Sequence, residues 1–178
     1  MTETSNSINA ISQAQHYPPM IRIIAIGSHH GADVIGWLAC EKLQKTLQKE
    51  QLDWRLCRNP THLPELVQDC DIAIIIDALL SDQPAGQVIN LSWPIDQIDN
   101  LSSYSTHGIN VIQALQLAAT LGQLPSHTYL LGLSVTNQEQ DTAAIVSKAL
   151  PQLQQALSQI INKVTETKYC ELQVCVAV

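Results

Sequence analysis

Two aspartates and one histidine, Asp33, Asp77 and His107, occupy positions from which they could bind one metal ion. Asp33 follows the apolar run IRIIAIG, Asp77 closes the apolar run DIAIIIDA, and His107 opens a segment that continues GINVIQAL. In a mostly parallel sheet, the loops at the carboxyl ends of the strands share one edge, and ligands bind there where the strand order reverses. We therefore predict a metal site at this edge, with Asp33, Asp77 and His107 as its ligands.

Carboxylate oxygens and an imidazole nitrogen suit zinc, nickel, manganese or iron better than ions that prefer thiolates. Three protein ligands leave positions open for water or for a substrate group. A metal ion in such a site polarises a carbonyl and lowers the pKa of bound water, and the carboxylates manage protons. This chemistry is that of amide hydrolysis. His29 and His30, in GSHHGAD, are further candidate ligands in the same loop.

Each of these residues also has a simpler interpretation. Asp33 could cap the following helix through backbone N–H groups. Asp77 could be a solvated acid at a strand end or a helix cap, since an unpaired carboxylate is costly to bury. His107 could be structural, and His29 and His30 could be exposed loop residues. The coincidence of all three residues on one predicted edge favours the metal site.

Other classes of function find less support. The stretch GSHHGADVIG does not fit GxGxxG and has no Walker lysine, and no Ser or Cys lies in a GxSxG elbow. The net charge is −7, with only 9 Lys and Arg, which argues against nucleic acid as a partner. The five cysteines form no CxxC pair, so neither a zinc knuckle nor a redox dithiol is predicted.

Length and composition predict one globular domain. Hydrophobic residues make up 46% of the 178 residues, yet no apolar run approaches the roughly 20 residues needed to cross a membrane. Residues 1–15 lack the features of a secretory signal, so we expect a cytoplasmic protein with reduced cysteines. Residues 1–19 are polar and end in a Pro pair, which predicts a flexible leader, and residues 20–178 form the domain. We expect a monomer.

The hydrophobic pattern alternates between strands and helices. Strands are predicted at 21–27, 52–57, 72–78, 87–91 and 128–133, and helices at 33–49, 62–68, 108–121 and 141–164, with Pro151 a possible kink or break. The β-branched tail, 169–178, predicts an additional edge strand. This alternation indicates an α/β fold, a three-layer domain with a mainly parallel sheet.

The sequence between about residues 21 and 156 resembles the nickel-iron hydrogenase maturation endopeptidases. These enzymes trim the C-terminal extension from the hydrogenase large subunit after nickel insertion. The resemblance lies in the segments IIAIGSHHGADVIGWLACEKL, IAIIIDALLSDQPAGQVI, YSTHGINVIQAL and TYLLGLSV. It implies a five-stranded mixed sheet between helices, with residues 87–91 as a short antiparallel strand.

The resemblance places Asp33 and Asp77 at the family's two carboxylate ligands and His107 at its imidazole. It implies that the three residues bind nickel supplied by the substrate precursor, held there by the precursor's cysteines. Zinc or another divalent ion is an alternative in the resting site. The implied function is a metal-dependent endopeptidase whose partner is the hydrogenase large-subunit precursor.

The chain departs from the family pattern in two loops. Family members usually have Gly-Asn and a longer loop before the first ligand, where this chain has GSHHGAD. They also usually have an Asp-Gly-Gly-Thr-like turn, linked to substrate selection, where this chain reads CRNPTHLPEL. One alternative is therefore a non-catalytic hydrogenase assembly or metal-binding factor on the same fold. Another is an unrelated α/β hydrolase or nucleotide binder whose acids are only caps.

Overall fold

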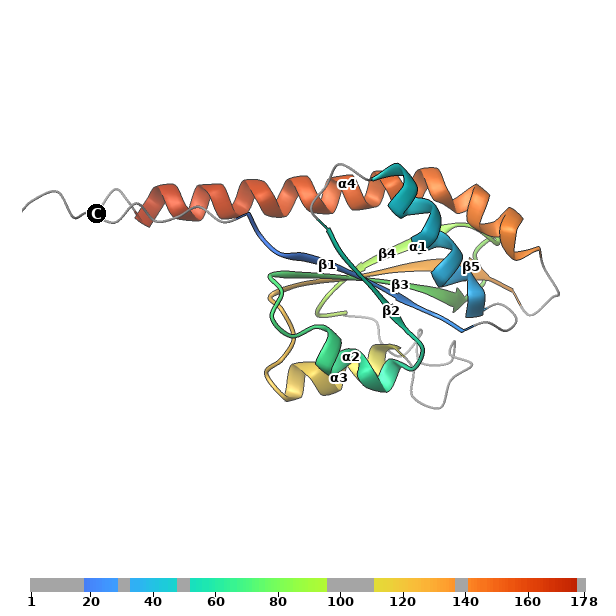
Figure 1. Cartoon of the computed structure of the whole chain (residues 1–178), viewed down its shortest axis with the longest axis horizontal. Coiled ribbons are helices and arrows are strands. Elements are labelled where there is room, and N and C mark those ends of the chain that lie inside the picture. The colour runs from blue at the N-terminus through green and yellow to red at the C-terminus, as the bar shows by residue number, and fades with distance from the viewer. Residues whose placement is uncertain (1–17, 29–32, 48–51, 96–110, 137–140, 176–178) are drawn as a thin grey trace, which may run out of the picture.

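A five-stranded sheet lies between two layers of helices in the computed structural model (Figure 1), which describes residues 18–28, 33–47, 52–95, 111–136 and 141–175, with side chains as far as Glu166. The strands are β1 (Ile21–Ile26), β2 (Leu52–Cys57), β3 (Ile72–Leu80), β4 (Val88–Ser92) and β5 (His127–Val135). Their order is β2-β1-β3-β5-β4. All neighbours are parallel except β4 and β5, which are antiparallel. The mixed sheet and its antiparallel strand confirm the expectation from the family resemblance.

Helices cover both faces of the sheet. One face carries α1 (Val34–Thr46) and the long α4 (Thr142–Cys175). The other carries the short 3-10 helix η2 (Pro60–His62), α2 (Leu63–Leu66) and α3 (Val111–Thr120). The predicted three-layer α/β/α architecture is therefore confirmed.

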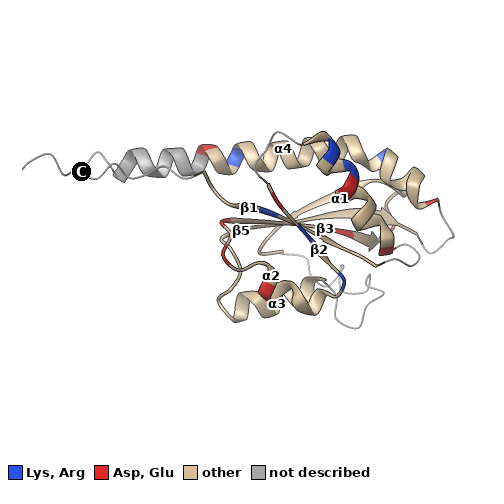
Figure 2. Cartoon of the chain, viewed as in Figure 1, with Lys and Arg blue, Asp and Glu red and all other residues tan. Residues whose placement is uncertain are grey.

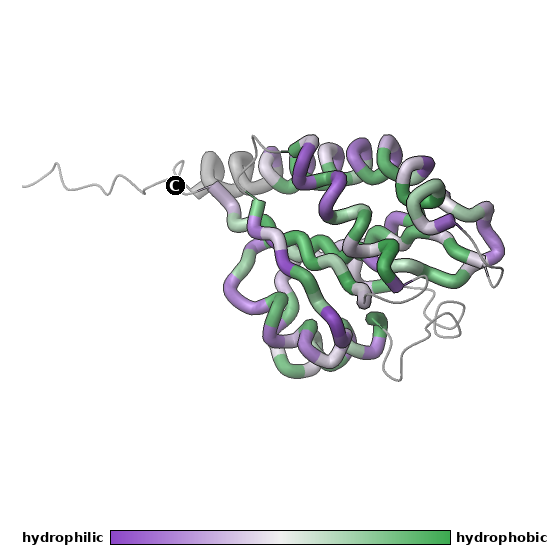
Figure 3. The backbone as a smooth tube through the Cα atoms, turned by 45° about the vertical axis from the view of Figure 1, so that its right-hand side comes forward, coloured by the Kyte–Doolittle hydropathy of each residue, from purple (hydrophilic) through white to green (hydrophobic). Residues whose placement is uncertain are grey.

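The side chains of β3 divide the core into two halves, because successive residues of a strand point to opposite faces. Ile72, Ile74 and Ile76 belong to the core cluster that includes α1 and α4 residues. Ile75 and Leu79 belong to the cluster that includes α2 and α3 residues. Figure 3 shows the hydrophobic strands at the centre of the molecule. This double burial explains why β3 reads as an almost unbroken run of Ile and Ala.

A charged cluster ties α2 to the sheet. The Arg22 side chain, only 12% exposed, donates to the Asp53 carboxylate at 2.7 Å and to the carbonyl oxygens of Leu66 and Gln68 at 2.9 and 2.6 Å. Figure 2 shows charged residues on β1 and β2, where this cluster lies. The guanidinium thus satisfies carbonyl groups that the short helix α2 leaves without partners at its C-terminal end.

The C-terminal tail differs from its predicted structure. Residues 169–175 continue α4, so the prediction of an edge strand over 169–178 is wrong for the part that the structure describes. Pro151 lies inside this helix and does not end it. Buried residues on both sides of it, Ala149 and Leu153, hold the helix against the sheet. The sequence has no Gly or Pro after Pro151, and a helix once started is extended at little cost.

Strand β3 also differs from its predicted length. It continues to Leu80, because Leu79 and Leu80 pair with Ser134 and Val135 of a longer β5. Asp77 therefore lies inside the strand, opposite Gly132, and does not end it. The described part of α3 agrees with the predicted helix, whose first residues, 108–110, lie outside the described residues together with the predicted leader.

Helix α1 begins unusually close to the sheet because two glycines have no side chain. A Cβ atom on Gly36 would lie 2.0 Å from the Ile26 carbonyl oxygen and 3.3 Å from that of Ile76. A Cβ atom on Gly27 would lie 2.3 Å from the Asp33 carbonyl oxygen. The first turn of α1 therefore rests directly on the carboxyl ends of β1 and β3.

This packing predicts that the substitution Gly36→Ala destabilises the protein. Alanine normally stabilises a helix interior by about 1 kcal/mol relative to glycine. Here the added methyl group must displace α1 from the sheet, and we expect the free energy of unfolding to fall by about 1–3 kcal/mol, measured by urea denaturation.

Gly122→Ala is the control, because a Cβ atom there meets nothing within 4 Å and only its φ of +68° is unfavourable. It should cost about 1 kcal/mol. A Gly36→Ala protein as stable as the wild type would show that the close packing is not required.

Candidate functional site

The predicted site lies where the sheet topology reverses. From β1 the chain passes to β2 on one side, and then to β3 on the other side of β1. In open α/β sheets, such a switch point creates the crevice in which ligands bind. Asp33 follows β1 and Asp77 lies in β3, so the two predicted carboxylates flank this point.

Asp33 precedes α1 without capping it. Its side chain makes no capping hydrogen bond to the helix, and its backbone is helical, with φ of −64° and ψ of −19°. The Ser28 hydroxyl donates to the Asp33 carboxylate at 3.5 Å, and the Ser28 N–H donates to the Asp33 carbonyl at 3.1 Å. The interpretation of Asp33 as a simple helix cap is therefore wrong, and the short loop between β1 and α1 is closed by Ser28.

Asp77 is buried, with 9% of its surface exposed. One of its carboxylate oxygens accepts a hydrogen bond from the N–H of Ala78 at 2.8 Å. By the alternation along β3, its side chain points to the same face as Ile75 and Leu79, toward the α2 and α3 layer. Asp77 is thus not a solvated acid at a strand end.

Burial decides the protonation state of Asp77 in the absence of a cation. The pKa of Asp77 is raised to about 8, chiefly because burial removes the carboxylate from water; the hydrogen bond from Ala78 opposes this rise, and the negative charge of Asp33 adds to it. The two carboxylates are therefore close enough to repel each other. A carboxylate pair of this kind is stabilised in its charged form by a cation placed between or beside its members.

Cys57 lies at the end of β2 beside this pair. Its thiol is 2% exposed and donates to the Asn59 carbonyl oxygen at 3.1 Å. Burial raises the pKa of Cys57 to about 11, against the effect of the Asn59 hydrogen bond and with a further increase from Asp77. The thiol is neutral at physiological pH, so Cys57 is a structural neighbour of the acids and not a nucleophile.

The histidines of the predicted site, His107, His29 and His30, lie outside the described residues. Within the described part of the chain, no group of three His, Cys, Asp or Glu side chains is arranged to hold a metal ion. The structure thus brings Asp33 and Asp77 close enough to interact electrostatically. The binding of a metal ion by His107 stays a prediction. Val111, four residues after His107 and the first described residue of α3, is buried in the core cluster that also contains Ile26 and Cys57.

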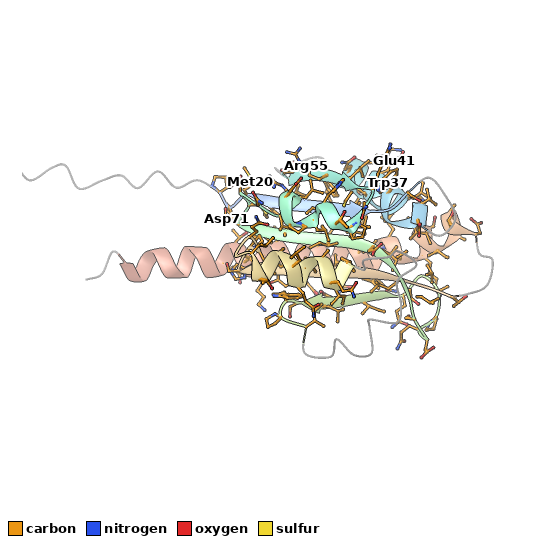
Figure 4. The ribbon with its side chains drawn as sticks, turned by 90° about the horizontal axis from the view of Figure 1, so that it is seen from below. Met20, Trp37, Glu41, Arg55 and Asp71 are labelled. Atoms are coloured by element: carbon orange, nitrogen blue, oxygen red, sulfur yellow. The ribbon has the colours of Figure 1, made fainter. Side chains whose placement is uncertain are left out.

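A cleft lies beside the two acids, next to the segment CRNPTHLPEL that the family resemblance links to substrate selection. It has a volume of about 530 Å³ and is lined by Trp37, Leu56, Cys57, Arg58, His62, Glu65 and Leu66. Trp37 comes from the first turns of α1, and the other residues come from the end of β2 and from η2 and α2. Figure 4 shows Trp37 at the end of the sheet opposite to Met20 and Asp71. The helical spacing of Trp37 from Asp33, four residues, is a further signal in the sequence that Trp37 lies near this acid.

Comparison with known proteins identifies relatives of this fold. A family model described as hydrogenase maturation protease matches residues 39–166, more than half of the chain. The hydrogenase maturating endopeptidase HybD of Escherichia coli is similar in structure, with a TM-score of 0.59 and 18% identity over 79% of this chain and 93% of that chain. The [NiFe] hydrogenase maturation protease HycI of Thermococcus kodakarensis has a TM-score of 0.58 and 20% identity, over 81% and 93% of the two chains. At these identities the structural likeness establishes the fold.

No curated protein is similar enough to match the chain. Among the described residues, no helix combines the length and the apolar character that crossing a membrane requires.

The buried acid predicts a pH-dependent stability for the metal-free protein. The folded-state pKa of about 8 exceeds the ordinary value of 3.8, so between these values the folded state binds more protons than the unfolded state. The free energy of unfolding should therefore fall as the pH rises from about 4 to about 8 and then level off. Each pKa unit corresponds to about 1.4 kcal/mol, so the fall is on the order of a few kcal/mol.

The measurement is urea denaturation across this pH range in the presence of a chelator. Asp77→Asn should flatten the curve, because the amide does not titrate. Asp82→Asn, at an exposed acid, should leave it unchanged. Equal pH slopes for wild type and Asp77→Asn would refute the assignment of the buried proton to Asp77.

Proposed function

Because the chain belongs to the hydrogenase maturation protease family, we propose that it is a metal-dependent endopeptidase that removes the C-terminal extension of a nickel-iron hydrogenase large-subunit precursor after nickel insertion. The observation that carries this proposal is the pair of Asp33 and Asp77 at the switch point of the sheet. The family match supports an endopeptidase, and the acids support a substrate that brings a cation.

The nickel of the loaded precursor is, in this proposal, part of the substrate. Asp33 and Asp77 bind it, together with His107 as the third protein ligand. A divalent ion beside the scissile amide polarises its carbonyl and makes a nearby water more acidic. Hydrolysis then adds the hydroxyl of water to the acyl carbon, and its proton goes to the departing amine.

The burial of Asp77 explains how the protein would distinguish loaded from unloaded precursor. Without a cation, the carboxyl group is neutral at pH 7, because its ionised form is poorly solvated. Binding of a divalent ion displaces this proton and compensates the charges of both acids. A precursor without nickel provides no such compensation, so it would bind without assembling the charged site.

Asp33 has a complementary role in this scheme. It is partly exposed and lies at the start of α1, fixed by Ser28 and by the glycine contacts with the sheet. It can therefore meet an ion that arrives with the precursor from solvent, whereas Asp77 holds the ion from the protein side. One partly exposed and one buried carboxylate form a site that is open to a large substrate.

This proposal predicts that His107→Ala and Asp77→Asn each reduce cleavage of a nickel-loaded precursor at least a hundredfold, the range expected for loss of a group that acts in proton transfer or metal binding. Mass spectrometry of the precursor before and after incubation detects release of the C-terminal peptide. Nickel-free precursor should stay intact with every variant.

His127→Ala is the matched control for His107→Ala, because His127 opens β5 at the opposite end of the sheet from Asp77. Its cleavage rate should equal that of the wild type. Normal cleavage by folded His107→Ala would exclude the proposed mechanism. Nickel-dependent binding of the precursor by the wild type without any cleavage would instead identify the chain as an assembly factor.

A further inference from the structure

Strand β4 lies at one edge of the sheet, and part of its backbone faces away from β5. In an antiparallel pair, residues that bond to the partner strand alternate with residues that face away from it. The Trp93 N–H donates to β5 at 2.8 Å, so Val88, Asn90 and Ser92 direct their N–H and C=O groups outward. The Val88 N–H agrees with this direction, because it donates to the Gln152 side chain of α4 at 3.1 Å.

The two edges of the sheet differ in their protection. An exposed edge pairs with other strands unless charged side chains, proline or a covering segment prevents it. At the opposite edge, β2 carries Asp53 and Arg55, which form an ion pair at 2.8 Å. Strand β4 reads VINLS and carries neither a charge nor a proline. Among the described residues, only Gln152 bonds to its outward backbone, which leaves the groups of Asn90 and Ser92 for a covering strand.

A groove follows this outer edge. It includes a pocket of about 270 Å³ lined by Asn90, Ser92, Tyr129, Gln159, Ile160 and Lys163. Gln152, Gln159 and Lys163 lie on one face of α4, since they are spaced seven and four residues apart. An extended segment placed between this face and β4 would pair its backbone with the strand and direct alternate side chains into the pocket.

Residues 1–17 leave the sheet at the end where β4 stops. Ile21, at the start of β1, is level with His127 at the start of β5, through β3. Ser92, the last residue of β4, pairs with Tyr129, two residues further along β5. The outer edge is thus three strands away from β1, or about 14 Å. Seventeen residues span up to about 56 Å when extended, so this segment can reach the edge and run along it.

The composition of this N-terminal segment suits an uncharged edge. Residues 4–15, TSNSINAISQAQ, contain no charged side chain, so pairing them with β4 would bury no charge. Ile8, Ala10 and Ile11 form a short apolar stretch between Ser, Asn and Gln residues. The family model begins at residue 39, so the segment lies outside the region that this match covers.

We propose that residues 1–17 add a sixth strand to the sheet by pairing with the outer edge of β4, with an apolar side chain of residues 8–11 over the pocket beside α4. The added strand protects the edge from pairing with another chain, a task that charged side chains perform on β2. The inference is independent of the proposed function. Val88 and Tyr129 pack against the core on the α4 side, whereas Asp77 points to the opposite face.

The test measures amide hydrogen exchange by NMR in the full chain. The N–H groups of Asn90 and Ser92 should exchange about tenfold or more slowly in the wild type than in the double variant Ile8→Asp/Ile11→Asp, because the two charges keep the segment off the groove. Ile89 and Leu91, whose N–H groups face β5, should exchange equally in both proteins, which checks that the variant is folded.

The double variant Thr2→Asp/Ala14→Asp is the matched control. It places the same two charges in the segment but outside residues 8–11, and it should keep the slow exchange of Asn90 and Ser92. Nuclear Overhauser effects between residues 8–11 and 89–92 should identify the paired strands in the wild type.

Three results would overturn the proposal. The first is fast exchange of Asn90 and Ser92 in the wild type, and the second is the absence of Overhauser effects between the two segments. The third is slow exchange that persists in Ile8→Asp/Ile11→Asp. In that case, dependence on protein concentration would identify a second copy of the chain as the covering strand, and independence would identify another segment of the same chain.

Discussion

The close contact between the first turn of α1 and the sheet is the constraint on which the candidate site depends. Gly36 rests on the carbonyl groups of Ile26 and Ile76, and Gly27 admits the backbone of Asp33. Because these backbones touch without side chains between them, the acid that follows β1 lies within electrostatic range of the acid inside β3. The same turn presents Trp37 to the neighbouring cleft. One packing contact thus fixes the position of Asp33 relative to Asp77 and the position of Trp37 at the cleft.

Burying the Asp77 carboxylate where no cation is present costs free energy. Asp77 interrupts an otherwise apolar strand, and its neighbour Asp33 increases the cost of ionising it. A protein selected for stability alone would place an apolar residue there. The protein retains an acid that burial keeps neutral at physiological pH unless a nearby cation favours its charged form. The nearby Cys57 thiol, also buried and neutral, adds no competing nucleophile.

Most of the fold could be predicted from local patterns. The apolar runs at β1, β3 and β5 mark strands buried on both faces, and the helical spacing after Asp33 marks α1. Two errors have physical causes. The apolar run predicts a strand that ends at residue 78, but pairing with β5 continues to Leu80. The β-branched tail predicts a strand, but residues 169–175 continue a helix whose earlier turns pack on the sheet, and tertiary packing outweighs local propensity.

The sequence alone determined which residue types were available: two acids after apolar runs, a histidine before an amphipathic segment, and glycines near the turns. It also determined the alternation of strands and helices, because burial on a sheet or helix leaves a periodic pattern. Only the tertiary structure decided that Asp77 is buried, that Asp33 is not a cap, and that Trp37 and Leu56 line one cleft. These properties depend on contacts between residues that are distant in the chain. The order of the strands brings such residues together, and this order leaves no local pattern in the sequence.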